Sequence, residues 1–188
     1  MSSPFSILKP KDGFLGLPPE LAVSYEEAGA VIIPFGLEAS VSYGSGTENG
    51  PAAMLAASHE VELFDEDLWC EPVERYGVVT AREPVIDNSD IAATLKVLET
   101  MTTAVLVDGK FPFVFGGEHS ITPGAIRPFL KKYDDLIILH FDAHADLRVA
   151  FEGFRWSHAS IMANVLAELP VRRIVQVGVR DLCEAEHE

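Results

Sequence analysis

Four short runs of mostly apolar residues, separated by segments with helical spacing, constrain the fold of this chain more than any other feature. The runs cover residues 30–33, 111–115, 136–141 and 173–179. Short and nearly uninterrupted apolar runs are typical of strands that are buried on both faces. Strands that alternate with helices form right-handed βαβ units, in which the strands are parallel and helices cover the sheet. The sequence therefore predicts an α/β fold with three αβα layers and a mainly parallel sheet.

The clearest helix is predicted to begin after Asn88-Ser89-Asp90, with Asn88 or Ser89 as its N-cap, and to end at Gly109. Its apolar positions recur at intervals of three and four residues. These positions are Ile91, Leu95, Leu98, Thr102 and Val105. Several prolines punctuate the first 28 residues, which are expected to form an irregular arm. We expect this arm to lie over a single domain that spans residues 1–188.

The charge balance argues against two classes of partner. The chain has 14 Lys and Arg residues against 29 Asp and Glu residues, a formal net charge of −15. Nucleic acids and anionic membranes are bound through clustered positive charge, so neither is expected as a partner. No apolar stretch approaches the roughly 20 residues that cross a bilayer. Two widely separated cysteines, Cys70 and Cys183, form no disulfide framework, which favours a cytoplasmic location.

The motif with the most chemical content is His140-Phe141-Asp142-Ala143-His144-Ala145-Asp146, at the carboxyl end of the third apolar run. If the backbone stays extended, Asp142, His144 and Asp146 point to one side because side chains alternate along a strand. Two adjacent carboxylates on one face repel each other unless a cation lies between them, and a divalent metal ion is the usual solution. The motif therefore predicts a metal site.

Two further histidines are expected to lie near this motif. His119, in Gly116-Gly117-Glu118-His119-Ser120, also follows an apolar run, and His158 begins the helix after the motif. The carboxyl ends of neighbouring parallel strands meet at one edge of a sheet, so these side chains should share a crevice. His158 is a candidate proton carrier. His140 lies one step deeper in the strand and is expected to be packed rather than to bind metal.

Imidazole and carboxylate donors without thiolates suit Mn²⁺, Fe²⁺ or Zn²⁺. His119, Asp142 and Asp146 can hold one ion, and Asp142 with His144 can hold a second, since a carboxylate has two oxygens. Two ions that share a water lower its pKa and generate hydroxide at neutral pH, which is hydrolytic chemistry. Each ion would still need about one or two further carboxylates to complete its coordination.

In their order and spacing, GGEHS, HFDAHAD and SHAS resemble the ureohydrolase family of arginases and agmatinases. Residues 42–47 and 50–53 (SYGSGT and GPAA) look like the early loop and helix of that family. The resemblance implies an arginase-like fold and two Mn²⁺ per complete active site. It implies metal ligation by His119, Asp142, His144 and Asp146. It also implies that Asp142 and His158 are catalytic, with His158 moving protons or positioning substrate.

The resemblance further implies attack by hydroxide on a guanidinium carbon, release of urea, and assembly into trimers or hexamers. A later family motif, S-x-D-x-D-x-x-D-P, supplies the remaining metal ligands and is absent from these 188 residues. We therefore expect the chain to be the amino-terminal portion of a ureohydrolase, truncated at its C-terminus and inactive alone.

Residues 147–156 lack the Asn, Thr and Ser with which arginases bind the α-carboxylate and α-amino groups of their substrate. This favours the agmatinase-like branch and agmatine, a small cationic guanidino compound, as substrate, with putrescine and urea as products. Arg148 and Arg155 leave open an arginase, a formimidoylglutamase or another guanidino-acid hydrolase. A non-catalytic metal-binding or scaffolding relative is the alternative from a different class. A deacetylase-like zinc hydrolase is disfavoured, because it does not need His119 and His144 together.

Overall fold

The computed structural model describes residues 3–169, 171 and 173–187. The strands are β1 (Ala30–Phe35), β2 (Val78–Thr80), β3 (Phe111–Gly116), β4 (Ile137–Phe141) and β5 (Arg173–Val177). The α-helices are α1 (Gly50–Ser58), α2 (Pro72–Tyr76), α3 (Ile91–Val107), α4 (Thr122–Leu130), α5 (Ile161–Glu168) and α6 (Glu184–His187). Short 3₁₀ turns are η1 (Pro10–Asp12), η2 (Phe14–Gly16), η3 (Thr47–Asn49), η4 (His119–Ile121) and η5 (His158–Ser160).

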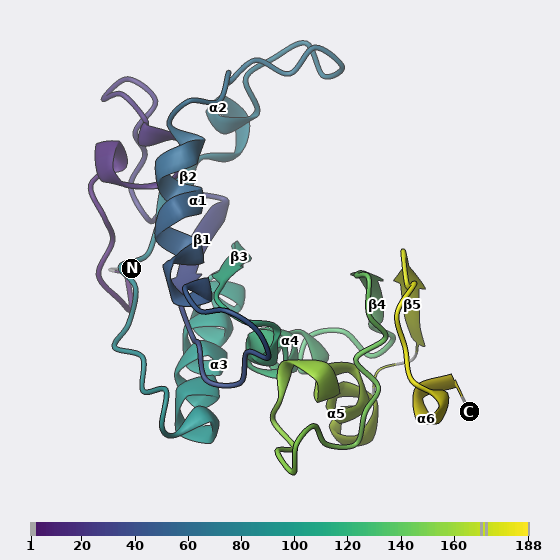
Figure 1. The fold of residues 1–188 in the computed structure, drawn as a ribbon. Helices are drawn as coiled ribbons and strands as arrows, with labels where there is room; N and C mark the ends of the chain where they lie inside the picture. The colour runs from purple at the N-terminus through teal and green to yellow at the C-terminus, as the bar shows by residue number, and fades with distance from the viewer. Residues whose placement is uncertain (1–2, 170, 172, 188) are drawn as a thin grey trace.

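The strands form two parallel sheets. One has the order β2-β1-β3, with Ile33 opposite Val114, and the other pairs β4 with β5, with Leu139 opposite Val175. Figure 1 shows β4 and β5 standing apart from the first three strands, with α4 and α5 lying between the two groups and below them in this view. The predicted parallel α/β architecture is present. The single predicted sheet requires β3 and β4 to be hydrogen-bonded to each other or to a shared neighbour. Within the described residues they belong to two separate sheets.

The core lies around β1 and the inner face of α3. Residues 31–35 of β1 are buried, as its uninterrupted apolar sequence predicts. The predicted apolar stripe of α3 is buried along its whole length, and α3 packs against β1, β3 and α4. α4 comes close to α3 at Gly124, where an added Cβ would lie 2.8 Å from the carbonyl oxygen of Leu95. This packing joins the first sheet to the helices that precede β4.

The N-cap of α3 is Asp90, whose side chain accepts a hydrogen bond from the backbone N–H of Ala93 at 3.0 Å. The prediction of Asn88 or Ser89 as the cap is wrong, because both side chains bind elsewhere. The Asn88 side-chain oxygen accepts from the Glu38 N–H, and the Ser89 hydroxyl donates to Asp87. Asn88, Ser89 and Asp90 are all residue types that favour the N-cap position, so tertiary contacts decide which of them caps α3.

The segment predicted as an N-terminal arm contains η1 and η2 and lies along β2. Ile7 forms an antiparallel bridge with Ala81, and the Phe14 N–H donates to the Thr80 hydroxyl at 2.8 Å. The assignment of residues 1–188 to one domain stays a prediction. In the described part of the chain, no helix has the length and apolar content that a bilayer crossing requires.

The burial of α3 leads to a matched pair of stability predictions. Leu98 is fully buried, whereas the preceding residue, Val97, is 39% exposed. Leu98→Ala leaves a cavity in the core and should lower the free energy of unfolding by about 2–5 kcal/mol. Val97→Ala should change it by less than about 1 kcal/mol. Urea denaturation followed by circular dichroism measures both, and equal losses would contradict the assigned core.

Candidate metal centre

The candidate site is built by the segments that follow β3 and β4. After β3, Gly116 and Gly117 turn the chain into η4, which begins at His119. An added Cβ at Gly117 would lie 2.4 Å from the carbonyl oxygen of Leu37, so only glycine allows this turn to pack against the end of β1. After β4, residues 142–146 run past η4 toward η5. η4 and η5 contact each other, and this contact places the His119 segment beside the start of α5.

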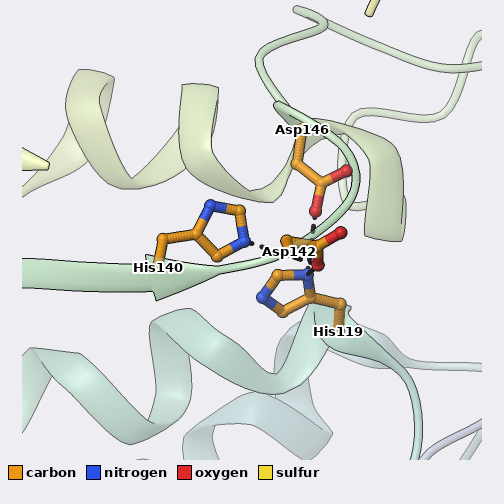
Figure 2. Close-up of side chains that lie close together, drawn as sticks. All are labelled: His119, His140, Asp142 and Asp146. Atoms are coloured by element: carbon orange, nitrogen blue, oxygen red, sulfur yellow. Dashed lines mark hydrogen bonds and ion pairs between the residues drawn. The ribbon is translucent and has the colours of Figure 1, made fainter. Parts of the chain in front are cut away.

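Four side chains converge where these segments meet (Figure 2). The His119 Nδ1 lies 2.8 Å from the Asp146 Oδ2 and 3.6 Å from the Asp142 Oδ2. The His140 Nε2 lies 3.5 Å from the same oxygen of Asp142. One potential ligand atom from each of the four residues lies within 4.8 Å of the other three. The structure therefore brings together the predicted ligands His119, Asp142 and Asp146, and adds His140 to them.

His144 lies on the opposite side of Asp142 from this cluster. Its backbone N–H and its Nδ1 approach the Asp142 Oδ1 at 2.8 and 3.0 Å, and its side chain is 60% exposed. The two oxygens of Asp142 thus face two different sets of groups. Oδ2 faces His119 and His140, whereas Oδ1 faces His144. This is the geometry that a carboxylate needs in order to bridge two metal ions.

The backbone reaches this arrangement differently from the extended strand that the sequence suggests. β4 ends at Phe141, and Asp146 has a left-handed backbone conformation with φ of 54°. Side-chain alternation therefore does not carry through the motif. Met162 and Ala163 donate their backbone N–H groups to the Asp146 carbonyl, and these bonds from α5 hold the turn in place.

His140 is buried behind the cluster, and the residue that orients it is Gln176 of β5. The Gln176 side-chain nitrogen lies 2.7 Å from the carbonyl oxygen of Ala145, which identifies it as the donor. The same nitrogen lies 3.0 Å from the His140 Nδ1, which must then be an acceptor. A neutral His140 consequently carries its proton on Nε2, facing Asp142. His140 is packed beside the site, as expected, with its Nε2 3.5 Å from the Asp142 Oδ2 and without a hydrogen-bond partner among the described residues. That His140 does not bind metal stays a prediction.

The electrostatics of the cluster keep its groups in the forms that metal binding needs. Burial by itself raises the pKa of Asp142, but the hydrogen bonds from His144 and the nearby imidazole of His119 outweigh it. The net effect lowers the pKa of Asp142, so its carboxylate is ionised at neutral pH. Burial, reinforced by His119, lowers the pKa of His140 below its ordinary value, and this ring is neutral under the same conditions.

The donor set fits a divalent ion. Asp142 and Asp146 bring two carboxylates next to one imidazole in a largely buried place, where like charges repel strongly unless a cation lies between them. Mixed oxygen and nitrogen donors without sulfur suit Mn²⁺, Fe²⁺ or Zn²⁺. The cluster therefore has the chemistry of a metal centre.

His158 shares a cavity with the cluster. A cavity of about 440 Å³ is lined by the cluster residues His119, Asp142 and Asp146, and also by His144 and His158. The His158 ring lies between two hydroxyls, with its Nδ1 3.3 Å from the Ser40 Oγ and its Nε2 2.9 Å from the Ser42 Oγ. The structure thus places every predicted site residue around one space.

The two arginines considered for substrate recognition differ in position. Arg148 lines a neighbouring cavity of about 170 Å³ and lies 3.4 Å from the Glu186 carboxylate. Arg155 donates to Glu168 at 2.6 Å and to Asn164 at 3.1 Å, both on α5. The Arg155 guanidinium is therefore bound to α5. The Arg148 guanidinium lies near the site and pairs with the Glu186 carboxylate.

The structure adds two supporting residues that the sequence motifs do not indicate, Ser40 and Gln176, and it makes Glu118 of the GGEHS motif the partner of Ser40. Ser40 lies just before the loop of residues 42–47, whose motif hints at a contact with the site. Gln176 has no such signal, because its position beside the site depends on how β5 pairs with β4.

Fold and site together define an α/β protein with a candidate metal centre at the carboxyl ends of parallel strands. In a comparison with known protein families, the model of the arginase family matches residues 28–188. The N(1)-aminopropylagmatine ureohydrolase of Synechocystis sp. is 35% identical over 175 residues, which cover 89% of this chain and 56% of the relative. The agmatinase of Bacillus subtilis is 30% identical and covers 87% of this chain and 56% of its own. The chain belongs to the arginase family.

Solved structures agree with this assignment. The agmatine ureohydrolase of Thermoplasma volcanium matches with a TM-score of 0.81 and 28% identity, covering 90% of this chain and 56% of that one. The chain of a putative agmatinase from Clostridium difficile matches with a TM-score of 0.80 and 27% identity, covering 87% and 59%. The predicted family and arginase-like fold are confirmed, and the names of the relatives agree with the agmatinase-like branch. The chain spans about half the length of the relatives it matches.

The cluster predicts stabilisation of this chain by divalent metal. Binding to the folded state alone raises the free energy of unfolding by about 2.7 kcal/mol when free Mn²⁺ is about 100 times its dissociation constant. Thermal denaturation with and without Mn²⁺ measures the effect. It should fall on acidification, because protons compete for the carboxylates and imidazoles.

Asp142→Asn should abolish most of the stabilisation. Glu62→Gln, which removes an exposed carboxylate in a loop outside the cavity, should preserve it. Equal responses from the two variants would mean that the metal binds elsewhere on the acidic surface.

Proposed function

We propose that the protein carrying this chain is a manganese-dependent ureohydrolase that cleaves the guanidino C–N bond of agmatine to give urea and putrescine. The observation that carries the proposal is that the two carboxylate oxygens of Asp142 face different groups. One oxygen faces His119, which also contacts Asp146, and the other faces His144. Binuclear hydrolytic chemistry needs two metal ions held close together, and a carboxylate with one oxygen facing each set of donors can hold them so.

In this proposal His119, Asp142 and Asp146 hold one Mn²⁺, and Asp142 and His144 hold the second. These residues offer three donors to the first ion and two to the second, which leaves both incompletely coordinated. The remaining carboxylates would come from outside these 188 residues. We therefore propose that the chain alone binds metal weakly and does not turn over substrate.

The bound ions would supply hydroxide from water at neutral pH. The carboxylates of Asp142 and Asp146 would hold the ions through their negative charge. His158 lies in the same cavity and delivers a proton to the leaving amine nitrogen, so that the product departs as a neutral or protonated amine. Ser42, 2.9 Å from the His158 Nε2, holds the ring nitrogen toward the cavity.

The charge around the site favours a cationic substrate. Asp181 and Glu186, which hold no metal ion in this proposal, line the cavity that adjoins His158, and among the described residues the guanidinium in that lining belongs to Arg148. Because Glu186 lies beside Arg148, little positive charge remains to attract the carboxylate of a guanidino acid. The names of the relatives support agmatine or its N(1)-aminopropyl derivative.

Cytoplasmic location and assembly into a trimer or hexamer also belong to this proposal. Both rest on the family resemblance and on the cysteine usage of the chain.

Urea release tests the proposed reaction. The protein carrying this chain, loaded with Mn²⁺, should release urea from agmatine or N(1)-aminopropylagmatine in preference to arginine or formimidoylglutamate. Asp142→Asn should lower kcat/KM by more than about 100-fold, because even residues that only support metal ligands cost 10- to 100-fold. His158→Asn should lower kcat by about 10²- to 10⁴-fold, the usual contribution of a general acid.

Glu62→Gln is the matched control and should leave turnover unchanged. Absence of urea from every guanidino compound in the presence of Mn²⁺ would contradict the proposal. If metal still stabilised the protein in that case, the non-catalytic metal-binding relative would be the better description.

A further inference from the structure

Glu118 is a buried carboxylate that the proposed metal chemistry does not use. It is 5% exposed and immediately precedes His119. Its Oε2 accepts the backbone N–H groups of Ala39 and Ser40 at 3.0 and 2.7 Å. Its Oε1 accepts the Ser40 hydroxyl at 2.9 Å and the Ser120 hydroxyl at short range. All four partners donate, so both oxygens of Glu118 act as hydrogen-bond acceptors.

The hydrogen bond to Glu118 determines whether the Ser40 hydroxyl donates or accepts in its other contacts. A serine hydroxyl has one proton and two acceptor lone pairs. The Ser40 proton goes to Glu118, so every other contact of the Ser40 Oγ must be one in which it accepts. Two groups of His158 make such contacts: its backbone N–H at 3.0 Å and its ring Nδ1 at 3.3 Å.

The ring proton of His158 consequently lies on Nδ1. The Nε2 is then the unprotonated nitrogen of the neutral ring, and the Ser42 hydroxyl, 2.9 Å away, can donate to it. The Ser157 hydroxyl is 3.5 Å from Nδ1 and accepts the Ala159 N–H at 3.2 Å. It retains a lone pair, so its position is compatible with a protonated Nδ1.

We propose that Glu118 is a positioning residue that acts through Ser40 to hold the His158 ring as the Nδ1–H tautomer, leaving Nε2 to exchange protons. The role of that exchange in catalysis rests on the proposed function, whereas the tautomer itself does not. In the proposed reaction the ring gains a proton at Nε2 and gives it to the leaving nitrogen from the same atom. The ring then returns to the Nδ1–H form.

Long-range ¹H–¹⁵N correlation spectra of the histidine rings test this in the metal-free 188-residue chain. His158 should show the pattern of a neutral Nδ1–H ring. His59 provides an internal reference of the opposite kind, because its Nε2 lies 2.8 Å from the carbonyl oxygen of Gly13 and must donate to it. An Nε2–H pattern at His158 in the unsubstituted chain would overturn the proposal.

Substitutions test whether the hydrogen bonds from Glu118 through Ser40 to His158, which we call the relay, set the tautomer, or whether packing alone does so. Glu118→Gln introduces a side-chain amide that can donate to Ser40, which frees the Ser40 proton for the His158 Nδ1. The ring should then shift to the Nε2–H tautomer. Ser40→Ala removes the acceptor and should also raise the Nε2–H population, without altering the buried carboxylate beside His119. Glu62→Gln, an exposed loop carboxylate away from His158, is the control and should retain Nδ1–H. The His59 pattern reports whether each variant is folded.

An unchanged His158 tautomer in folded Ser40→Ala, or in folded Glu118→Gln, would contradict the relay. These outcomes are distinct from failure of the proposed function. A protein that shows the predicted tautomers but releases no urea would refute the reaction and leave the positioning role of Glu118 intact.

Discussion

The repulsion between two carboxylates that share one imidazole is the constraint on which the rest of the site depends. Asp142 and Asp146 both direct an oxygen at the His119 Nδ1, at 3.6 and 2.8 Å. A neutral imidazole cannot balance two negative charges in a largely buried position, so the arrangement calls for a cation. The turn at Gly117 and the left-handed backbone at Asp146 are the local features that bring these groups together.

The surrounding elements keep the polar groups of the site in fixed orientations. β5 contributes Gln176, which orients His140 behind Asp142. The loop after β1 contributes Ser40, which joins Glu118 to His158. The candidate metal cluster and His158 are thus linked to one core through neighbouring residues of a single turn, Glu118 and His119. Both depend on how that turn packs against the end of β1.

Strands β1, β3, β4 and β5, the long helix α3 and the gathering of the candidate site residues at one place were predictable because each has a local cause. Apolar runs indicate buried strands, and ligand residues that directly follow strands are carried to one edge. Strand pairing was not predictable, since the apolar runs alone do not say which strands are neighbours, and β3 and β4 belong to different sheets among the described residues. The short elements α2 and β2 escaped detection because segments of five and three residues hold too little periodicity. Ser40 lies 78 residues from its partner Glu118 in the sequence, and Gln176 lies 31 residues from the Ala145 carbonyl that it binds. Contacts over such separations leave no local pattern in the sequence.

Metal binding at this cluster, with Asp142 between two ions, can be observed by anomalous diffraction at the manganese absorption edge from crystals of the chain equilibrated with Mn²⁺. We expect an anomalous peak in contact with His119, Asp142 and Asp146. At higher Mn²⁺ we expect a second, weaker peak between Asp142 and His144. Anomalous density confined to other acidic residues, with the cluster unchanged, would contradict this expectation.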